Sequence, residues 1–373
     1  MPLITGPPGS GKTAHVLQQF RAALAAKKQD VRLLVPTATM AHHLENQVAR
    51  EGFVLRRGLI QTLNGFVDLQ VPDFPKAPES VVYLLVEEAV ARLNRAEFRR
   101  VADLPGFCAR LARAILEFSA AGCDGDRLAG RIPDTPLAAA FLAVYQEVDR
   151  ALDRRGLLLR AKRLECAAAR IRANGLPDIA AIWLDGFHAL PDPELAIVHA
   201  LVCHVDLTLT LPDYEATAPL RKHLVEAGFT EERFAKKRPA PAMVLVKAAR
   251  IERECEEIAR RILKHASAGR PFREIGIIVR SHEPHVPLLR ATLQRFSIPA
   301  HFYFDENAVE HPAIRFLTRA IDAMLGGWDH AATLAVLRLA PRFADSPALD
   351  RLDFAVREQI PNTGLGSLKA LLP

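Results

Sequence analysis

The stretch GPPGSGKT, residues 6–13, decides the fold of this chain. Its spacing, G-x-x-x-x-G-K-[ST], is that of a phosphate-binding loop (P-loop), in which glycines let successive backbone N–H groups turn toward an anion. Lys12 is expected to reach the β- and γ-phosphates of a nucleoside triphosphate, and the Thr13 hydroxyl to bind Mg²⁺. The predicted nucleotide contacts are Gly6, Pro7, Pro8, Gly9, Ser10, Gly11, Lys12 and Thr13.

The flanks of the loop fit this interpretation. A short apolar strand is predicted over 2–5, and an amphipathic helix over 13–26 would point its positive end at the phosphates. The segment VRLLVPT (31–37) predicts a buried strand, 38–50 a second helix and 59–63 a further short strand. This order is a βαβ unit of a parallel sheet, and it disfavours the alternative of a simple Gly-rich turn.

Composition sets wider bounds. A length of 373 residues predicts two or three domains, and 50% hydrophobic with 25% charged residues is ordinary for a globular protein. Five cysteines without a C-x-x-C pair indicate reduced thiols in a cytoplasmic protein and argue against a zinc or iron–sulfur site. No apolar run reaches membrane-spanning length, so no membrane partner is expected. The net charge of +6 weakly favours a polyanionic partner.

The periodicity of apolar residues predicts five segments. Residues 1–70 plus 176–212 form a first lobe, with further strands at 179–187 and 205–212. Residues 71–175 form an all-helical insertion, and 213–242 a connection. Residues 243–325 form a partial second lobe with strands at 243–249, 275–281 and 298–304, and 326–373 a helical segment. The predicted fold is an α/β P-loop NTPase of two RecA-like parallel-sheet lobes, the second incomplete, with the insertion in the first.

Asp185 is the predicted partner of the loop. It ends an apolar run, which places a carboxylate at the carboxyl edge of the sheet beside the phosphates, where it would bind Mg²⁺ with Thr13. The alternative is a strand-end Asp that caps a turn with Gly186. Many ATP-hydrolysing motors place a Glu directly after this Asp, but here the residue is Gly186. Nucleotide hydrolysis is therefore less secure than nucleotide binding.

Arg280 and the basic stretch 150–172 each have two interpretations. Arg280 ends the strand IGIIVR and would either stabilise charge on the γ-phosphate or lie on the surface. Residues 150–172 hold eight basic side chains, Arg154 and Arg155 among them, against Asp153 and Glu165. This stretch would either bind a phosphate backbone or serve solubility. The predicted catalytic set is Lys12, Asp185 and Arg280.

The order of these pieces resembles superfamily 1 DNA helicases of the UvrD type, and more closely the AddB/RexB subunit of bacterial helicase–nucleases. The specific matches are D-G-F at 185–187, LPGFCARLARAILEFSAAG at 104–122 and HPAIRFL at 311–317. The resemblance covers about residues 1–325. It identifies the family of the chain more narrowly than the P-loop, which is specific for a nucleotide alone.

The resemblance implies ATP and Mg²⁺ as cofactors, held by Lys12, Thr13 and Asp185, with Arg280 at the γ-phosphate. It implies DNA contacts at Pro36, Thr37, Gln61 and Thr62, to which the arginine stretch adds Arg154 and Arg155. The implied role is an ATP-binding, DNA-engaging subunit of a double-strand-break repair and recombination complex. Its partners would be single-stranded DNA or a duplex end and an AddA-type helicase–nuclease subunit.

The chain also departs from the helicase pattern. The D-E pair is Asp185-Gly186, the G-D-x-x-Q motif is missing after the strand at 205–212, and the nuclease residues and cluster cysteines of the family are not found. We therefore expect no nuclease activity and interpret the chain as the N-terminal part of a longer protein or a shortened relative. DNA-dependent ATPase or helicase activity stays open against a degenerate motor that acts as a DNA-binding scaffold. A P-loop small-molecule kinase is disfavoured by the second α/β block.

Overall fold

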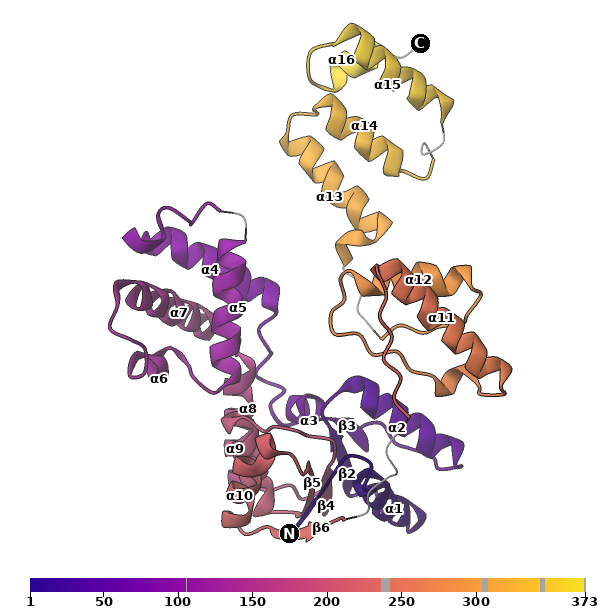
Figure 1. The fold of residues 1–373 in the computed structure, drawn as a ribbon. Helices are drawn as coiled ribbons and strands as arrows, with labels where there is room; N and C mark the ends of the chain where they lie inside the picture. Colours follow the sequence, from indigo (N-terminus) through magenta and orange to yellow (C-terminus); the bar gives the residue numbers. More distant parts are fainter. Residues whose placement is uncertain (105, 236–241, 304–307, 343–345, 372–373) are drawn as a thin grey trace. The chain divides into compact units, whose positions relative to one another are not determined.

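The structure of the chain is a computed structural model that describes residues 1–104, 106–235, 242–303, 308–342 and 346–371 (Figure 1). The chain divides into two compact units, Met1–Ala242 and Met243–Pro373, and each is described by itself. In the described residues, no helix combines the length and the apolar character needed to cross a bilayer.

A six-stranded parallel sheet forms the centre of the first unit. Its strands run in the order β3-β2-β4-β5-β1-β6. The predicted P-loop α/β fold is confirmed by this sheet. Because every strand is parallel, all carboxyl ends meet at one edge of the sheet, where ligands bind in folds of this class. The strands are β1 (Pro2–Gly6), β2 (Val31–Val35), β3 (Ile60–Thr62), β4 (Ala181–Leu184), β5 (Asp206–Pro212) and β6 (Thr230–Arg233).

Helices cover both faces of this sheet (Figure 1). On one face, α1 (Lys12–Ala25) and α2 (Ala38–Arg50) bury Phe20 and Leu44 against Ile4 and Leu33 of the strands. On the other face, Leu34, Ile182 and Leu184 pack against a second group of helices. These are α3 (Leu63–Gln70), α8 (Arg160–Asn174), α9 (Asp192–Val202) and α10 (Ala218–Glu226). Burial on both faces explains why β2 and β4 are mostly apolar in sequence, and the threonines that alternate with leucines in β5 are buried as well.

The segment between β3 and β4 consists of helices. Val86, Ile115, Tyr145 and Val148 belong to a hydrophobic core of this segment's own. The helices predicted from apolar spacing are found within a few residues of their expected bounds. The segment lies in the same compact unit as the sheet, so its description as an insertion domain over 71–175 stays a prediction. Its helices are α4 (Glu79–Leu93), α5 (Phe107–Ala120), α6 (Gly125–Ala129) and α7 (Pro136–Arg154), followed by α8.

The predicted connection 213–242 requires a correction. Its first part contributes α10 and the strand β6, which pairs with β1, so the sheet continues to Arg233. The sequence of β6 is TEER, and all four residues are exposed. An exposed edge strand lacks the apolar alternation by which strands are recognised in sequence. Residues 236–241, which include Lys236, Lys237 and Arg238, lie outside the described residues.

The second unit contains helices but lacks the predicted parallel sheet in its described residues. Residues 243–249, 275–281 and 298–303 form no strand there, and residue 304 lies outside the described part. A strand requires neighbours for its backbone N–H and C=O groups, and a parallel strand is normally covered on both faces. Here Leu245 and Ile278 are 98% exposed. In the described residues these apolar segments therefore have neither a neighbouring strand nor a covering layer.

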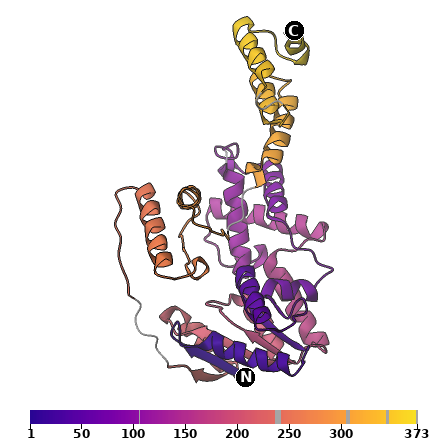
Figure 2. The same cartoon turned by 90° about the vertical axis from the view of Figure 1, so that its right-hand side faces the viewer.

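The helices of the second unit were expected from the sequence. Residues Ala259, Ile262, Leu293 and Ile298 form a small core between α11 and α12. Helices α13–α16, in orange and yellow in Figure 2, follow one another with no strand among the described residues. The helices are α11 (Ile251–Ser267), α12 (His285–Arg295), α13 (Pro312–Leu325), α14 (His330–Leu339), α15 (Pro347–Gln359) and α16 (Leu365–Lys369).

Candidate nucleotide-binding site

The P-loop connects the end of β1 to the start of α1. Gly9 and Gly11 have φ values of 75° and 99°, a region of backbone conformation that favours glycine. Gly11 is also the N-cap of α1, whose first turn begins with Lys12 and Thr13 and contains no acidic residue. The positive end of the helix dipole therefore has no carboxylate of its own turn beside it. This arrangement favours binding of an external anion at this position.

Lys12 folds its side chain back over the loop. Its Nζ donates to the carbonyl oxygens of Gly6 at 2.7 Å and Pro7 at 3.0 Å, and to the Ser10 hydroxyl at 3.4 Å. Burial lowers the pKa of Lys12, while the nearby negative charges of Asp185 and Asp213 act in the opposite direction. The three atoms that accept hydrogen bonds from Nζ, in Gly6, Pro7 and Ser10, are all uncharged. The ammonium group is therefore held within the loop without a hydrogen-bonded carboxylate, although Asp185 and Asp213 are near.

Asp185 follows β4 directly and is 1% exposed. Its Oδ1 accepts a hydrogen bond of 2.6 Å from the Thr210 hydroxyl of β5. Its Oδ2 is buried and has no hydrogen-bond partner among the described residues. A buried carboxylate oxygen without a hydrogen-bond partner costs free energy of folding unless a cation, or a water bound to a cation, contacts it. Asp185 therefore fits the predicted role as a Mg²⁺ ligand, direct or through water, together with Thr13.

Gly186 shows why the helicase Glu has no equivalent here. Its φ is 85°, and a Cβ at this position would lie 3.0 Å from both Cε and Sδ of Met40 on α2. The Gly186 N–H donates to the Thr210 hydroxyl at 3.2 Å, which fixes the turn after Asp185. The backbone and the packing of Met40 therefore both disfavour a side chain at the position where motors carry their catalytic base.

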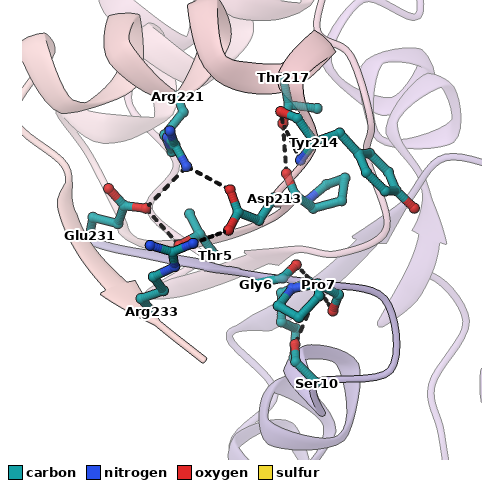
Figure 3. Close-up of polar contacts among 12 residues, drawn as sticks. Thr5, Gly6, Pro7, Ser10, Asp213, Tyr214, Thr217, Arg221, Glu231 and Arg233 are labelled. Carbon is teal, nitrogen blue, oxygen red and sulfur yellow. Dashed lines mark hydrogen bonds and ion pairs between the residues drawn. The ribbon is translucent and has the colours of Figure 1, made fainter. Parts of the chain in front are cut away.

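A charged network beside the loop was missed by the sequence predictions (Figure 3). Asp213 follows β5, and its N–H donates to the carbonyl of Gly6 at 3.0 Å. Arg221 and Arg233 donate to its two carboxylate oxygens at 2.8 and 2.5 Å. The hydrogen bond from Arg233 is the main cause that lowers the pKa of Asp213. The position of Asp213 at the end of a predicted strand was the one available signal, because both arginines come from the segment assigned to a connection.

The residues predicted to contact DNA next to the sheet lie together. Pro36 and Thr37 follow β2, and Gln61 and Thr62 end β3, which pairs with β2. Thr37 and Thr62 are the N-caps of α2 and α3, and accept hydrogen bonds from Met40 and Gly65 at 3.2 and 3.0 Å. The Gln61 Nε2 is buried without a hydrogen-bond partner in the described part of the chain. Thr37 and Thr62 therefore have a structural role as helix caps, and the DNA contact at all four residues stays a prediction.

The predicted arginines lie elsewhere. Arg154 and Arg155 are at the end of α7, where Arg154 donates to Glu147 at 3.1 Å and Arg155 to the carbonyl of Ala151 at 3.2 Å. Arg280 is exposed in the second unit, so its predicted place at the γ-phosphate stays a prediction.

Comparison with known proteins bears on the family. The chain is similar to the AddB subunit of the ATP-dependent helicase/deoxyribonuclease from Moorella thermoacetica, with 27% identity over 90% of the chain and 35% of the relative. It is 24% identical to the subunits of the same name from Symbiobacterium thermophilum and Geobacillus thermodenitrificans, over 91% and 90% of the chain and 35% of each relative. No protein-family model matches the chain. The chain thus spans about a third of the length of these relatives and matches their N-terminal part, and the predicted resemblance is confirmed.

Proposed function

We propose that this chain binds ATP with Mg²⁺ and engages DNA as part of a helicase–nuclease subunit that acts in double-strand-break repair. The observation that carries the proposal is the P-loop geometry together with the buried Oδ2 of Asp185 at the same sheet edge, which has no partner among the described residues. The names of the similar proteins support an ATP-dependent helicase and deoxyribonuclease context. The proposed partners are single-stranded DNA or a duplex end and an AddA-type subunit, in the cytoplasm.

The residues divide the work of binding among them. The loop N–H groups and Lys12 would hold the phosphates, and Thr13 and Asp185 would hold the metal ion. Bound Mg²⁺ would supply positive charge beside the β- and γ-phosphates. Thr210 orients the Asp185 carboxylate through its 2.6 Å hydrogen bond, so the carboxylate does not rotate away from the site. Arg280 would add positive charge at the γ-phosphate.

A second candidate function is favoured by Gly186. General-base positioning of water is worth about 10²–10⁴-fold in rate, and this position has no carboxylate, while a Cβ here would press on Cε and Sδ of Met40. The chain would then be a degenerate motor that binds ATP and DNA as a scaffold without turnover. The paired ends of β2 and β3, with Thr37 and Thr62, are the proposed DNA contact in both cases.

The two candidates are separated by measuring ATP binding and ATP turnover on the same protein, with and without single-stranded DNA. A motor hydrolyses ATP faster with DNA, and Lys12→Ala abolishes this turnover. A scaffold binds ATP without turnover, and its DNA binding survives Lys12→Ala. Lys28→Ala, at an exposed lysine in the turn after α1, is the matched control. DNA-independent phosphorylation of a nucleoside or sugar would overturn both and favour the kinase alternative.

A further inference from the structure

Two aromatic rings meet beside the P-loop. Phe234 directly follows β6, and its N–H donates to the carbonyl of Thr5 at 2.7 Å. Its ring lies edge-on to the ring of His15 on α1, with centroids 5.1 Å apart and an angle of 63° between the planes. The backbone of Phe234 passes so close to Gly6 that a Cβ there would lie 2.5 Å from the Phe234 carbonyl oxygen. The ring pair is therefore fixed against the first glycine of the loop.

The orientation of these side chains follows from the strand. Successive residues of an extended chain point to opposite faces of the sheet. Arg233 accordingly joins Asp213 on the α10 side, whereas Phe234 turns to the α1 side and packs at the margin of the core there. Phe234 is half-buried as a residue, so it is not enclosed in this core.

His15 is held by a chain of hydrogen bonds that also sets its tautomer. The Trp183 indole can only donate, and it donates to the Gln19 side-chain oxygen at 2.8 Å. The Gln19 amide nitrogen therefore faces His15, whose Nε2 lies 2.9 Å away and accepts. In the neutral ring the proton is then on Nδ1, which makes that atom a donor. A rigid aromatic ring with a defined donor is suited to contact a nucleoside.

The order of the strands gives the direction in which a nucleotide would extend. In the order β4-β5-β1-β6, Asp185 lies on one side of the P-loop strand and Phe234 on the other. Thr13 and Asp185 would hold a metal ion whose positive charge serves the terminal phosphates, so the γ end of a nucleotide would lie toward β4. The nucleoside leaves from the α-phosphate, at the opposite end, and so extends toward β6.

We infer that His15 and Phe234 form the nucleoside site of this P-loop, with the Phe234 ring as a stacking surface for the base. The inference rests on the proposed ATP binding and adds to it the part of the site that holds the nucleoside. The His15 Nδ1–H donates to the ribose or the α-phosphate. Every base has a π-face, so stacking on one phenyl ring selects for a nucleoside triphosphate over bare polyphosphate, and only weakly among bases.

The test compares ATP, GTP and inorganic tripolyphosphate, each with Mg²⁺, by calorimetry on the full chain and on Phe234→Leu and Phe234→Trp. Leucine keeps apolar contact with the core but removes the ring, and tryptophan keeps a ring. We expect Phe234→Leu to weaken ATP and GTP about tenfold, the effect of losing one base-stacking contact, and to leave tripolyphosphate unchanged. Phe234→Trp should bind ATP at least as tightly as the unmodified chain.

Each other outcome overturns the inference in a distinguishable way. Equal loss of ATP and tripolyphosphate in Phe234→Leu means that the ring supports the loop itself, which a lower melting temperature would also report. Unchanged affinity for all three ligands means that the base lies elsewhere, while ATP binding stands. If the unmodified chain binds neither ATP nor tripolyphosphate, the proposed function fails and this inference fails with it.

Discussion

Lys12 and Asp185 at the carboxyl edge of the sheet differ from the charged residues of the helices α4–α8 in how they are held. In the helical segment, one buried carboxylate, Glu147, pairs with Arg92, Arg150 and Arg154. Hydrogen bonds from Arg92 and Arg154 lower the pKa of Glu147, with burial acting against them. At the sheet edge, by contrast, Asp185 keeps a buried oxygen without a partner in the described residues, and the Lys12 ammonium group donates to neutral oxygens.

This difference indicates which residues serve ligand binding and which serve stability. Strand register and glycine turns position Lys12 and Asp185, so these two residues need no ion-pair partner and are left for a ligand, whereas Asp213 beside them is paired with Arg221 and Arg233. The helices position their charges by pairing them with each other. Substitutions at the edge should therefore change ligand binding more than stability, and substitutions in α4–α8 should do the reverse.

The largest expected effect tests the edge. Lys12→Ala removes a charged donor to the phosphates, a contact worth up to about 3 kcal/mol, so ATP affinity should fall about 100-fold. Titration with a fluorescent ATP analogue measures this, and Lys28→Ala should bind as the unmodified chain does. Because Lys12 contributes only local loop contacts, the melting temperature should change little. A large loss of stability in Lys12→Ala would break the comparison.

The next effect concerns Gly186, an edge position at which a side chain would change stability. Gly186→Ala places a side chain at a φ of 85° and 3.0 Å from Met40, so the free energy of unfolding should fall by about 2–3 kcal/mol. Gly228→Ala is the matched control, since its φ is 95° and no atom lies within 4 Å of a Cβ there. Urea denaturation of both separates the backbone cost from the clash. Equal losses in the two variants would show that Met40 does not exclude a side chain.

A smaller, pH-dependent effect is expected in the helices. Burial raises the pKa of Asp149 on α7 from 3.8 to about 6, while its Oδ2 accepts from the Gly125 N–H at 3.1 Å. Between about pH 4 and 6 the folded chain binds more protons than the unfolded chain, so this group's contribution to stability falls as pH rises. Asp149→Asn keeps the acceptor without the charge.

Asp149→Asn should therefore raise the free energy of unfolding by about 2 kcal/mol near pH 8, and the gain should vanish near pH 4. Thermal denaturation over this pH range measures it. Asp134→Asn, at an exposed turn of the same segment, should stay within about 0.5 kcal/mol of the unmodified chain at every pH. A pH-independent gain would mean that the charge on Asp149 is not its cause.

The sequence predicted the parts of the molecule that carry strong local signals. These parts are the P-loop, Asp185 at the end of β4, and α2 over 38–50. Each was predicted from motif spacing or apolar periodicity, and both signals can be seen in a single sequence. The strand β6 and the Asp213 network could not be predicted, because TEER is polar throughout and its pairing with β1 joins residues more than two hundred positions apart. The second sheet was predicted from apolar runs alone, although ladder formation also requires neighbouring strands.

The smallest expected effect concerns DNA and tests whether α7 has any role besides stability. Arg154 and Arg155 are partly engaged by Glu147 and by the carbonyl of Ala151, so their release to phosphates has a cost. If both contact DNA, the double alanine variant should lose only a few-fold in affinity, and the slope of log affinity against log salt should decrease by about 1–2. Fluorescence anisotropy at several salt concentrations measures the slope. Arg110→Ala/Arg113→Ala on α5 removes the same charge from the same segment, so an equal change in slope there would assign the effect to net charge and leave α7 with a structural role.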